Sequence, residues 1–312
     1  MENDNSFIYH YTKTENIFKI LETLSLKFSS FQKVNDPKES KIWPFKVYCL
    51  DSKSKETFEK ELFGKLNSFI LKNSKILCMT KDNNSHDKVT HYNKGYNHPR
   101  MWAQYAENNT GVCLVFDKDE FDNNFETLYK NKINFHREVE YLNSGLGTEI
   151  HTDGIPFDPY AIFYEKLLND GFNNYLYNHI KLHFKSLYYT KHTNWSEENE
   201  ERYVLINESD NNIFFPIQNS LKGIIITEDF PKEKLDELIN VCTRNNLQLQ
   251  KIIWRGWSTS LFPFVEKKQL SLNFTYTTHI PFKAFFFQAM TFDGEMKTLL
   301  MENGTVSTFE DL

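Results

Sequence analysis

Candidate catalytic and ligand-binding residues lie in two short segments of the chain, and the first is close to the N-terminus. It is the run Tyr9-His10-Tyr11-Thr12, which stands at the end of a predicted strand and just before a predicted helix. An imidazole, a phenol and the free backbone N–H groups of a helix start can converge there on an anionic ligand. The alternative is a histidine whose polar atoms are satisfied inside the core.

The second segment is acidic and lies directly before another predicted strand. It holds four glutamates between positions 197 and 201. Alternation along a strand would divide the side chains of this segment between two faces. One face would carry Glu198, Glu200 and Arg202, and the other Glu197, Asn199 and Glu201. Like charges at this spacing destabilise a fold unless they are paired or used, so the segment is a candidate site, with an acidic turn in solvent as the alternative.

Familiar catalytic signatures are missing or incomplete. The sequence has no Walker A loop and no Gly-x-Ser-x-Gly elbow. Gly145 and Gly147 form half of a dinucleotide-binding pattern, but Ile150 stands where the third glycine is required. This segment therefore predicts a turn.

Histidine spacing gives a weak signal for a metal. His179 and His183 lie four residues apart on a predicted helix, but Ile180 stands where a zinc protease would have its general base. Three more histidines, between positions 86 and 98, lie in a polar segment that predicts a solvated loop. We therefore expect no metal site.

Composition narrows the class of protein. The net charge of −6, with acidic and basic residues interspersed, argues against a general phosphate-binding surface. The first residues are polar and acidic rather than a leader peptide, and no apolar run approaches the length of a membrane span. Four scattered cysteines without a Cys-x-x-Cys pair predict reduced thiols. We expect a cytoplasmic protein that does not enter a membrane.

The elements that must position these residues mix helices and strands without strict alternation. Helical periodicity is expected after Thr12, from Phe58 to Ile70, from about 160 to 191 with a break near Gly171, and after Pro231. Thr12 and Glu15 have the spacing of a capping box. Strands are expected over 7–10, 26–28, 75–80, 111–116, 202–206 and 222–227, and beyond residue 244. This order favours an α+β fold in one domain, residues 1–312, over a parallel doubly wound fold.

Five ordered landmarks resemble a bacterial family called domain of unknown function 2971. They are Tyr9-His10-Tyr11-Thr12; Asn35-Asp36-Pro37-Lys38-Glu39; Cys78-Met79-Thr80; Met101-Trp102-Ala103-Gln104-Tyr105-Ala106 running into Gly111-Val112-Cys113 through Phe116-Asp117; and Trp195, Glu198, Glu200 and Arg202 followed by Lys222 to Ile225. The sequence departs from the family pattern at Met79 and Thr80, and at Glu201, where an aromatic residue is common. Glu201 adds a charge beside the expected site.

The resemblance implies a fold like that of the ADP-ribosyltransferases: a split, mostly antiparallel sheet with flanking helices, which binds NAD without a glycine fingerprint. It implies that Glu200 stabilises an oxocarbenium-like state through the ribose and that Glu198 orients the acceptor. His10 would bind the adenosine-side ribose, and Tyr105 or Tyr11 would stack on nicotinamide. The full set of cofactor-binding residues would be His10, Tyr11, Thr12, Tyr105, Asn35 and Arg202. Trp102, with Asn35 and Asp36, is alternatively a scaffold residue that holds Arg202 in place.

Two functional classes follow from the resemblance. The first is an NAD-consuming enzyme, either an ADP-ribosyltransferase that modifies a protein or a nucleic acid, or an NAD glycohydrolase. Such an enzyme would act as a toxin or an antiviral defence effector, with a partner protein of that system. The second is a catalytically inactive module that binds a nucleotide or a partner. The paired glutamates favour the enzyme, because a module that only binds an anionic dinucleotide has little use for clustered carboxylates.

Overall fold

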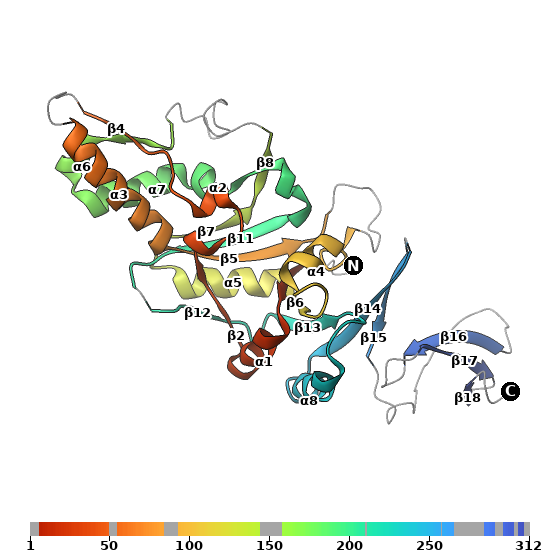
Figure 1. Cartoon of the computed structure of the whole chain (residues 1–312). Coiled ribbons are helices and arrows are strands. Elements are labelled where there is room, and N and C mark those ends of the chain that lie inside the picture. The colour runs from red at the N-terminus through yellow and green to blue at the C-terminus, as the bar shows by residue number, and fades with distance from the viewer. Residues whose placement is uncertain are drawn as a thin grey trace. The chain divides into compact units, whose positions relative to one another are not determined.

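We describe a computed structural model of the chain, which covers residues 6–49, 55–83, 93–143, 158–209, 211–256, 258–264, 284–290, 296–302 and 305–308. The fold is mixed α+β, with a large and mostly antiparallel sheet flanked by helices (Figure 1), as predicted. The turn expected at Gly145 and Gly147, and His86 and His91 of the expected solvated loop, lie outside the described residues.

The elements are these. The helices are α1 (Thr14–Thr23), α2 (Pro37–Ser40), α3 (Lys55–Asn73), α4 (Pro99–Tyr105), α5 (Lys118–Tyr129), α6 (Tyr164–Asp170), α7 (Phe172–Tyr188) and α8 (Leu235–Arg244), with 3-10 turns η1 (Phe31–Lys33), η3 (Thr193–Glu198) and η4 (Lys232–Lys234). The strands are β1 (Phe7–Thr12), β2 (Ser25–Lys27), β3 (Ser29–Ser30), β4 (Lys46–Tyr48), β5 (Ser74–Lys81), β6 (Val112–Asp117), β7 (Asn134–Glu138), β8 (Glu140–Leu142), β9 (Ala161–Phe163), β10 (Thr190–His192), β11 (Glu200–Ile206), β12 (Phe214–Pro216), β13 (Leu221–Ile226), β14 (Gln248–Arg255), β15 (Ser258–Pro263), β16 (Ala284–Met290), β17 (Met296–Glu302) and β18 (Thr305–Thr308).

The chain forms two compact units, each assembled from three separate segments. The first unit contains residues 1–10, 20–100 and 116–220, and the second contains 11–19, 101–115 and 221–312. Because the segments interleave, no single point in the sequence divides one unit from the other. The candidate site is built entirely from residues of the first unit.

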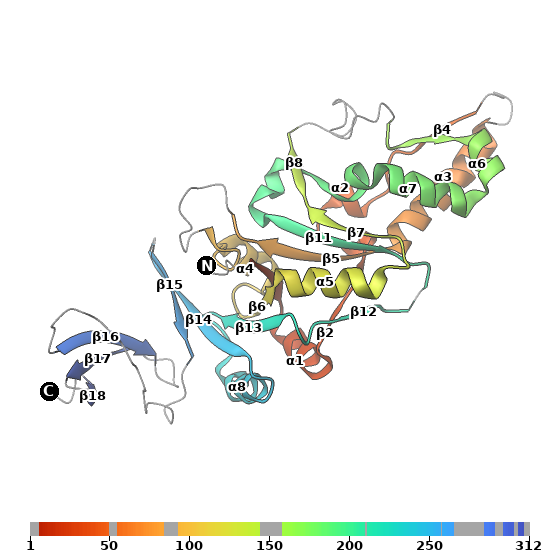
Figure 2. The ribbon, with the colours of Figure 1, turned by 180° about the vertical axis from the view of Figure 1, so that it is seen from behind.

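In the first unit, strand β5 is the centre of the sheet, in the order β1-β5-β11-β7. Each of these pairings is antiparallel, and the register places Glu200 opposite Thr80 and Arg202 opposite Cys78. Both faces are covered by helices. Figures 1 and 2 show α5 on one face of β5, β11 and β7, with α2, α3 and α7 on the other.

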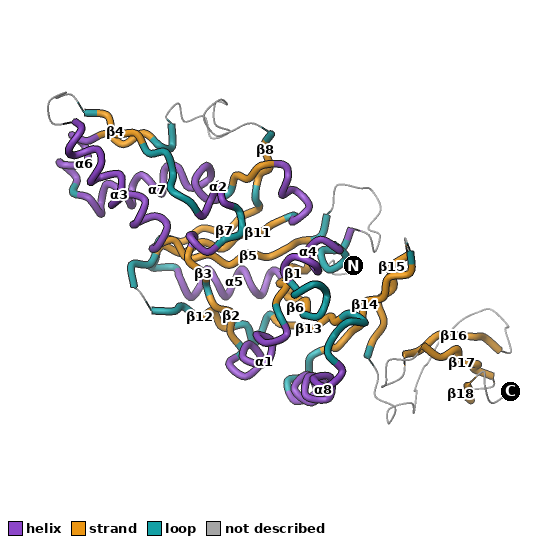
Figure 3. The backbone as a smooth tube through the Cα atoms, in the orientation of Figure 1, coloured by secondary structure: helices purple, strands orange, loops and turns teal. Residues whose placement is uncertain are grey.

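The face under α3 and α7 holds the larger core cluster. Phe69 of α3 packs edge to face against Phe172 and Tyr177 of α7. Figure 3 shows the two helices side by side. Buried Ile76 and Val204, from β5 and β11, belong to the same cluster. Burial of these apolar side chains is the main force that fixes the helices on the sheet.

Helices α6 and α7 are separated at Gly171, as the sequence predicts. Gly171 has φ 80° and ψ 151°, a conformation that only glycine adopts readily, and it both ends α6 and begins α7. The helical region expected over about 160–191 is thus formed by α6 and α7. Its two ends are the strands β9 and β10 rather than helix.

Helix α5 was not expected from periodicity. Asp117 caps it, since the Asp117 Oδ1 accepts a hydrogen bond from the Glu120 backbone N–H at 3.0 Å. Its aromatic residues Phe121 and Phe125 pack on Tyr203 of β11, with ring centroids 4.8 and 5.1 Å apart. Tyr203 therefore faces α5, whereas its neighbour Arg202 faces α2 and α7.

The second unit has its own part of the sheet, in the order β15-β14-β13-β6. Strands β13 and β14 are parallel, and α8 connects them. The capping box predicted for Thr12 and Glu15 is replaced by other contacts: α1 begins at Thr14, whose hydroxyl donates to the Thr110 carbonyl, and Thr12 accepts from the Asn16 side chain.

Two further predictions concern the cysteines and membrane-spanning helices. Cys49, Cys78, Cys113 and Cys242 are all free thiols, as their spacing predicted. Within the described ranges, no helix is both long and apolar enough to cross a bilayer.

Candidate functional site

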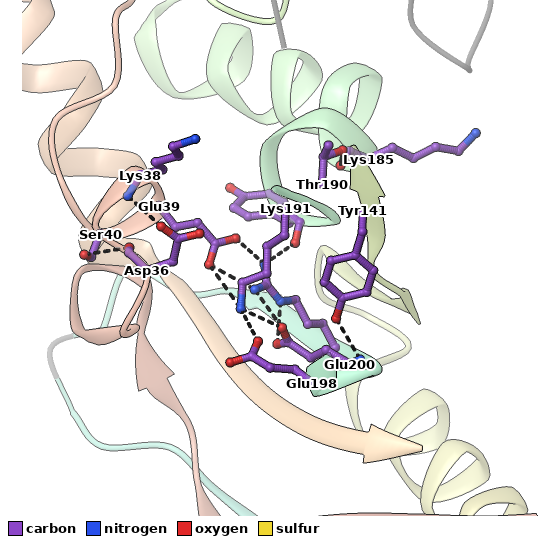
Figure 4. A network of polar contacts seen from close by, with 12 residues as sticks. Asp36, Lys38, Glu39, Ser40, Tyr141, Lys185, Thr190, Lys191, Glu198 and Glu200 are labelled. Atoms are coloured by element: carbon purple, nitrogen blue, oxygen red, sulfur yellow. Dashed lines mark hydrogen bonds and ion pairs between the residues drawn. The ribbon is translucent and has the colours of Figure 1, made fainter. Parts of the chain in front are cut away.

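Five charged side chains form a buried ion network on the α2 and α7 face of the sheet (Figure 4). They are Glu39 of α2, Lys191 of β10, Glu198 at the end of η3, and Glu200 and Arg202 of β11. None is more than 8 % exposed. Burying so many charges is unfavourable unless each one is paired, so their mutual contacts decide whether the network is stable.

Arg202 is the centre of the network and has no exposed surface. Its Nε donates to Glu200 Oε1 at 2.6 Å, and one Nη donates to Glu200 Oε2 at 2.9 Å. The guanidinium also holds both oxygens of Glu39, at 2.6 and 3.0 Å, and donates to the Tyr188 carbonyl at 2.6 Å. All five N–H donors of Arg202 are therefore used.

This arrangement corrects the role predicted for Arg202. A guanidinium with five satisfied donors has none left for a cofactor, so Arg202 is a structural residue and not a cofactor-binding one. Its planar fork serves two carboxylates and a carbonyl at once, a geometry that lysine cannot reproduce.

Lys191 joins the two glutamates that the sequence singled out. Its Nζ lies 2.6 Å from Glu198 Oε2 and 3.0 Å from Glu200 Oε2, and 3.9 Å from Glu39. The ammonium also lies 5.1 Å from the ring centroid of Trp195, a cation–π contact. Neither Lys191 nor this bridge was predicted from sequence.

Short elements place the glutamates in the network. Asp36 caps α2 by accepting from the Lys38 backbone N–H at 2.9 Å, and the Trp43 indole donates to the Glu39 carbonyl at 2.8 Å. At the other side, the Tyr141 hydroxyl accepts from the Glu200 backbone N–H at 3.0 Å. The Asn-Asp-Pro-x-Glu run is thus a device that presents Glu39 to Arg202.

The electrostatics of the network distinguish its two Arg202-bound carboxylates. Burial raises the pKa of Glu39. Burial also opposes ionisation of Glu200, but attraction by Arg202 and Lys191 outweighs it and lowers the Glu200 pKa to about 2. We attribute the difference to Lys191, which lies within 3.0 Å of Glu200 but 3.9 Å from Glu39. Of these two carboxylates, Glu200 therefore has the stronger preference for the ionised form.

With every group ionised, three carboxylates face two cations, so the network has one formal negative charge in excess. A positively charged group that develops beside Glu200 would be stabilised by this excess.

His10 lies at a break in strand pairing along β5. Strand β1 pairs with β5 at Thr80 and Lys81, and β3 takes the β5 edge at Lys75 and Ile76. Between these contacts, His10 Nδ1 donates to the Cys78 carbonyl at 3.1 Å. The imidazole thus satisfies a backbone group at the break in the sheet.

Among the described residues, no hydrogen bond uses the second nitrogen of His10, which leaves it for a ligand. A carbonyl only accepts, so the proton is on Nδ1 and Nε2 carries a lone pair. Burial lowers the pKa of His10, which keeps the ring neutral at pH 7, and the residue is only half-buried. Cys78 also links His10 to the network, because its thiol donates to Glu200.

The predicted division of the acidic segment is confirmed for the strand and wrong for its start. Glu200 and Arg202 share one face, and Glu201 lies on the other, where its carboxylate pairs with Lys118 at 2.7 Å. Glu198 belongs to η3, and the left-handed Asn199 (φ 41°) turns the chain before β11. Glu198 joins Glu200 through Lys191 rather than through strand alternation.

The remaining predicted residues lie elsewhere in the fold. Tyr11, Thr12 and Tyr105 belong to the second unit, where Tyr11 is buried edge to face against Trp102 at 5.2 Å. The side chain of Asn35 is exposed in the turn before α2. The cofactor roles of these four residues stay predictions.

A cavity of about 360 Å³ lies beside the network and includes Glu39 and Lys191 in its lining. This volume is at the lower end of the range for small-molecule sites, about 300–1,000 Å³. Aromatic walls come from Trp43 and Tyr160, Pro44 and Leu187 add apolar surface, and polar side chains line the rest.

The histidine pair of α7 is part of the core. His179 and His183 are buried with ring centroids 4.6 Å apart, and His179 Nε2 donates to the Pro159 carbonyl at 2.8 Å. In the part of the chain that the structure describes, no group of three or more metal-binding side chains is present.

Comparison with known proteins gives one match. Residues 101–203 match the model of a family described as "Protein of unknown function (DUF2971)". No curated protein and no solved structure matches the chain. The matched segment supplies Lys191, Glu198, Glu200 and Arg202, whereas Glu39 and His10 precede it. The predicted resemblance to this family is thus confirmed over residues 101–203.

Proposed function

We propose that the chain is an NAD-consuming enzyme of the ADP-ribosyltransferase type, which transfers ADP-ribose to a macromolecule or hydrolyses NAD. The free cysteines agree with work in a reducing cytoplasm, where such an enzyme would act as a toxin or antiviral effector with a partner protein. The acceptor would be a protein, a nucleic acid or water.

One observation carries this proposal. The ionised Glu200 and the neutral His10 both contact Cys78 of β5, one through its thiol and the other through its carbonyl. A dinucleotide at the break in the sheet could therefore meet a lone pair, from His10 Nε2, and an excess negative charge, from the network. NAD cleavage needs both, because a ribose must be held while positive charge develops at its C1′.

The proposed reaction is cleavage of the nicotinamide–ribose bond followed by transfer of the ribose to an acceptor. The bond between C1′ and the nicotinamide nitrogen breaks, and neutral nicotinamide leaves with the electron pair. Glu200 stabilises the oxocarbenium-like ribose, and the acceptor oxygen or nitrogen then bonds to C1′. Glu198 orients the acceptor and takes its proton. Lys191 and Arg202 position both carboxylates without contacting the substrate.

The test is nicotinamide release from NAD by purified protein, with NAD binding measured in parallel by calorimetry. Loss of the Glu200 charge in Glu200→Gln should reduce turnover roughly 100-fold or more, with little change in affinity. Glu198→Gln should reduce it less, and Glu197→Gln should have no effect, because Glu197 is 69 % exposed.

Glu201→Gln is the matched control for stability. Glu201 lies on the same strand, is equally buried and also pairs with a cation, but it faces α5. Equal loss of turnover in Glu200→Gln and Glu201→Gln would assign the effect to folding and would count against the proposal.

His10→Asn separates the two nitrogens of His10, because the amide can still donate to the Cys78 carbonyl but has no atom in place of Nε2. We expect NAD affinity to fall several-fold, for a loss of about 1 kcal/mol, while the melting temperature is retained. Unchanged affinity would remove His10 from the binding site.

A catalytically silent binding module is the second candidate. It is favoured by the hydrogen bonds of Glu200, whose two oxygens are already held by Arg202, Lys191 and the Cys78 thiol. Binding of NAD without any release of nicotinamide, even with cell lysate as a source of acceptors, would identify this function.

A further inference from the structure

The cavity beside the ion network is lined by carboxylates and by hydrogen-bond donors. Asp36 Oδ1 accepts from the Lys38 backbone N–H, and Asp158 Oδ1 accepts from the Tyr160 backbone N–H, each at 2.9 Å. Both oxygens of Glu39 are held by Arg202. Each of the three carboxylates thus has at least one oxygen held by a group of the protein.

Lys191 belongs to the ion network, but three other donors in the lining have no close partner among the described residues. Within the described residues, no hydrogen bond or ion pair uses the Lys38 ammonium or the Tyr160 hydroxyl. Lys46 has a single distant partner, Asp158 Oδ2 at 3.9 Å, and its side chain is 64 % exposed. In Figure 4 the Lys38 side chain extends away from the network, so its charge is not part of that structure.

His192 adds a fourth donor. Its Nδ1 accepts from the Asn194 backbone N–H at 3.2 Å, so the neutral ring carries its proton on Nε2. The Tyr160 hydroxyl also keeps its proton at neutral pH, because burial raises the Tyr160 pKa to about 12. Two ammonium groups, an imidazole N–H and a phenol therefore line one cavity.

We propose that this cavity is a binding site for a small phosphate-bearing anion, with Lys38, Lys46, His192 and Tyr160 as its ligand donors. Four donors that line one cavity match the three or more acceptor oxygens of a phosphate group. The aromatic wall of Trp43 and Tyr160 would accommodate a flat ring carried by the phosphate. The site does not depend on NAD cleavage, since none of the four donors belongs to the ion network.

The experiment is isothermal titration calorimetry of the full chain, without NAD and in a phosphate-free buffer, with pyrophosphate, ADP and adenosine as separate ligands. We expect saturable binding of pyrophosphate and ADP. Lys38→Ala and Lys46→Ala should each weaken it roughly threefold to tenfold, and the double variant more than either. Lys130→Ala, an exposed lysine at the end of α5, is the matched control and should bind like the wild type.

The three ligands distinguish the sources of the phosphate. Tighter binding of ADP than of pyrophosphate would identify a nucleotide, and equal binding would identify the phosphate groups alone. Adenosine binding as tightly as ADP would overturn the proposal, because the phosphates would then contribute nothing. Absence of saturable binding, or equal affinity in the lysine variants and the wild type, would also overturn it. Nicotinamide release by the same lysine variants reports separately on the proposed function.

Discussion

Arg202 combines complete burial with five satisfied donors, so its charge is stable only while its partners are in place. Removal of one partner from a buried ion pair typically costs about 3–5 kcal/mol, because the other charge remains buried and uncompensated. The same pair on the surface is worth much less. Geometry, and not charge alone, is therefore what the network requires at position 202.

We predict that Arg202→Lys destabilises the protein by about 3 kcal/mol or more, although it preserves the charge. The ammonium cannot reach Glu39, Glu200 and the Tyr188 carbonyl together. Urea unfolding followed by circular dichroism measures the change. Arg255→Lys is the matched control: Arg255 also holds both oxygens of a glutamate, Glu228, but on the surface. Equal shifts of the two midpoints would contradict a geometric role for Arg202.

Contacts between residues that are far apart in the sequence could not be predicted. Strand alternation correctly placed Glu200 and Arg202 on one face, because that rule depends on adjacent residues only. Glu39 is 163 residues away from Arg202, and nothing in a single sequence couples the two positions. Lys191 is only nine residues from Glu200 and was missed for another reason, since a lone lysine before an acidic run has no distinctive spacing.

At the scale of elements, apolar periodicity located α3 and α7, whose buried faces follow the helical repeat. Helix α5 was missed although its signals were present. Asp117 and Glu120 have capping spacing, and Phe121, Phe125 and Tyr129 recur every four residues. The polar residues between those rings weakened the periodic pattern, so capping was the better guide here.

Two glycines give a prediction with opposite signs. An added Cβ meets nothing within 4 Å at either Gly171 or Gly64, so the backbone alone decides the effect of alanine. Gly171→Ala should destabilise by about 1–3 kcal/mol, because its φ of 80° with ψ 151° is strained for other residues. Gly64→Ala, inside α3, should stabilise by up to about 1 kcal/mol. Thermal melts of both variants test this, and shifts of the same sign would contradict it.

At the scale of the whole molecule, buried histidines set the response to acid. Burial and the neighbouring His183 lower the pKa of His179 from 6.5 to about 4. The unfolded chain therefore binds a proton at His179 between these values and the folded chain does not. The stability contributed by the neutral ring is complete above pH 6.5 and is lost as the pH falls towards 4. Burial lowers the pKa of His10 and His98 too, which adds to this trend.

We predict that His179 alone accounts for about 2–3 kcal/mol of the stability lost between pH 7 and pH 4.5. His179→Gln retains a donor for the Pro159 carbonyl but does not titrate. The variant should lose correspondingly less stability than the wild type over this interval, measured by urea unfolding at the two pH values. Parallel losses in both proteins would mean that His179 titrates normally in the folded state.

The position of the ion network in the chain also bears on how long the folded protein persists. The network closes only when α2, near the N-terminus, meets β11 and β10, near residue 200. Contacts between such distant segments form after local structure, so we expect the network to be absent from the folding transition state. Interactions that form late slow unfolding without speeding folding. The buried charges would then mainly lengthen the half-life of the native state. Stopped-flow measurements on Arg202→Lys should show faster unfolding at an unchanged folding rate.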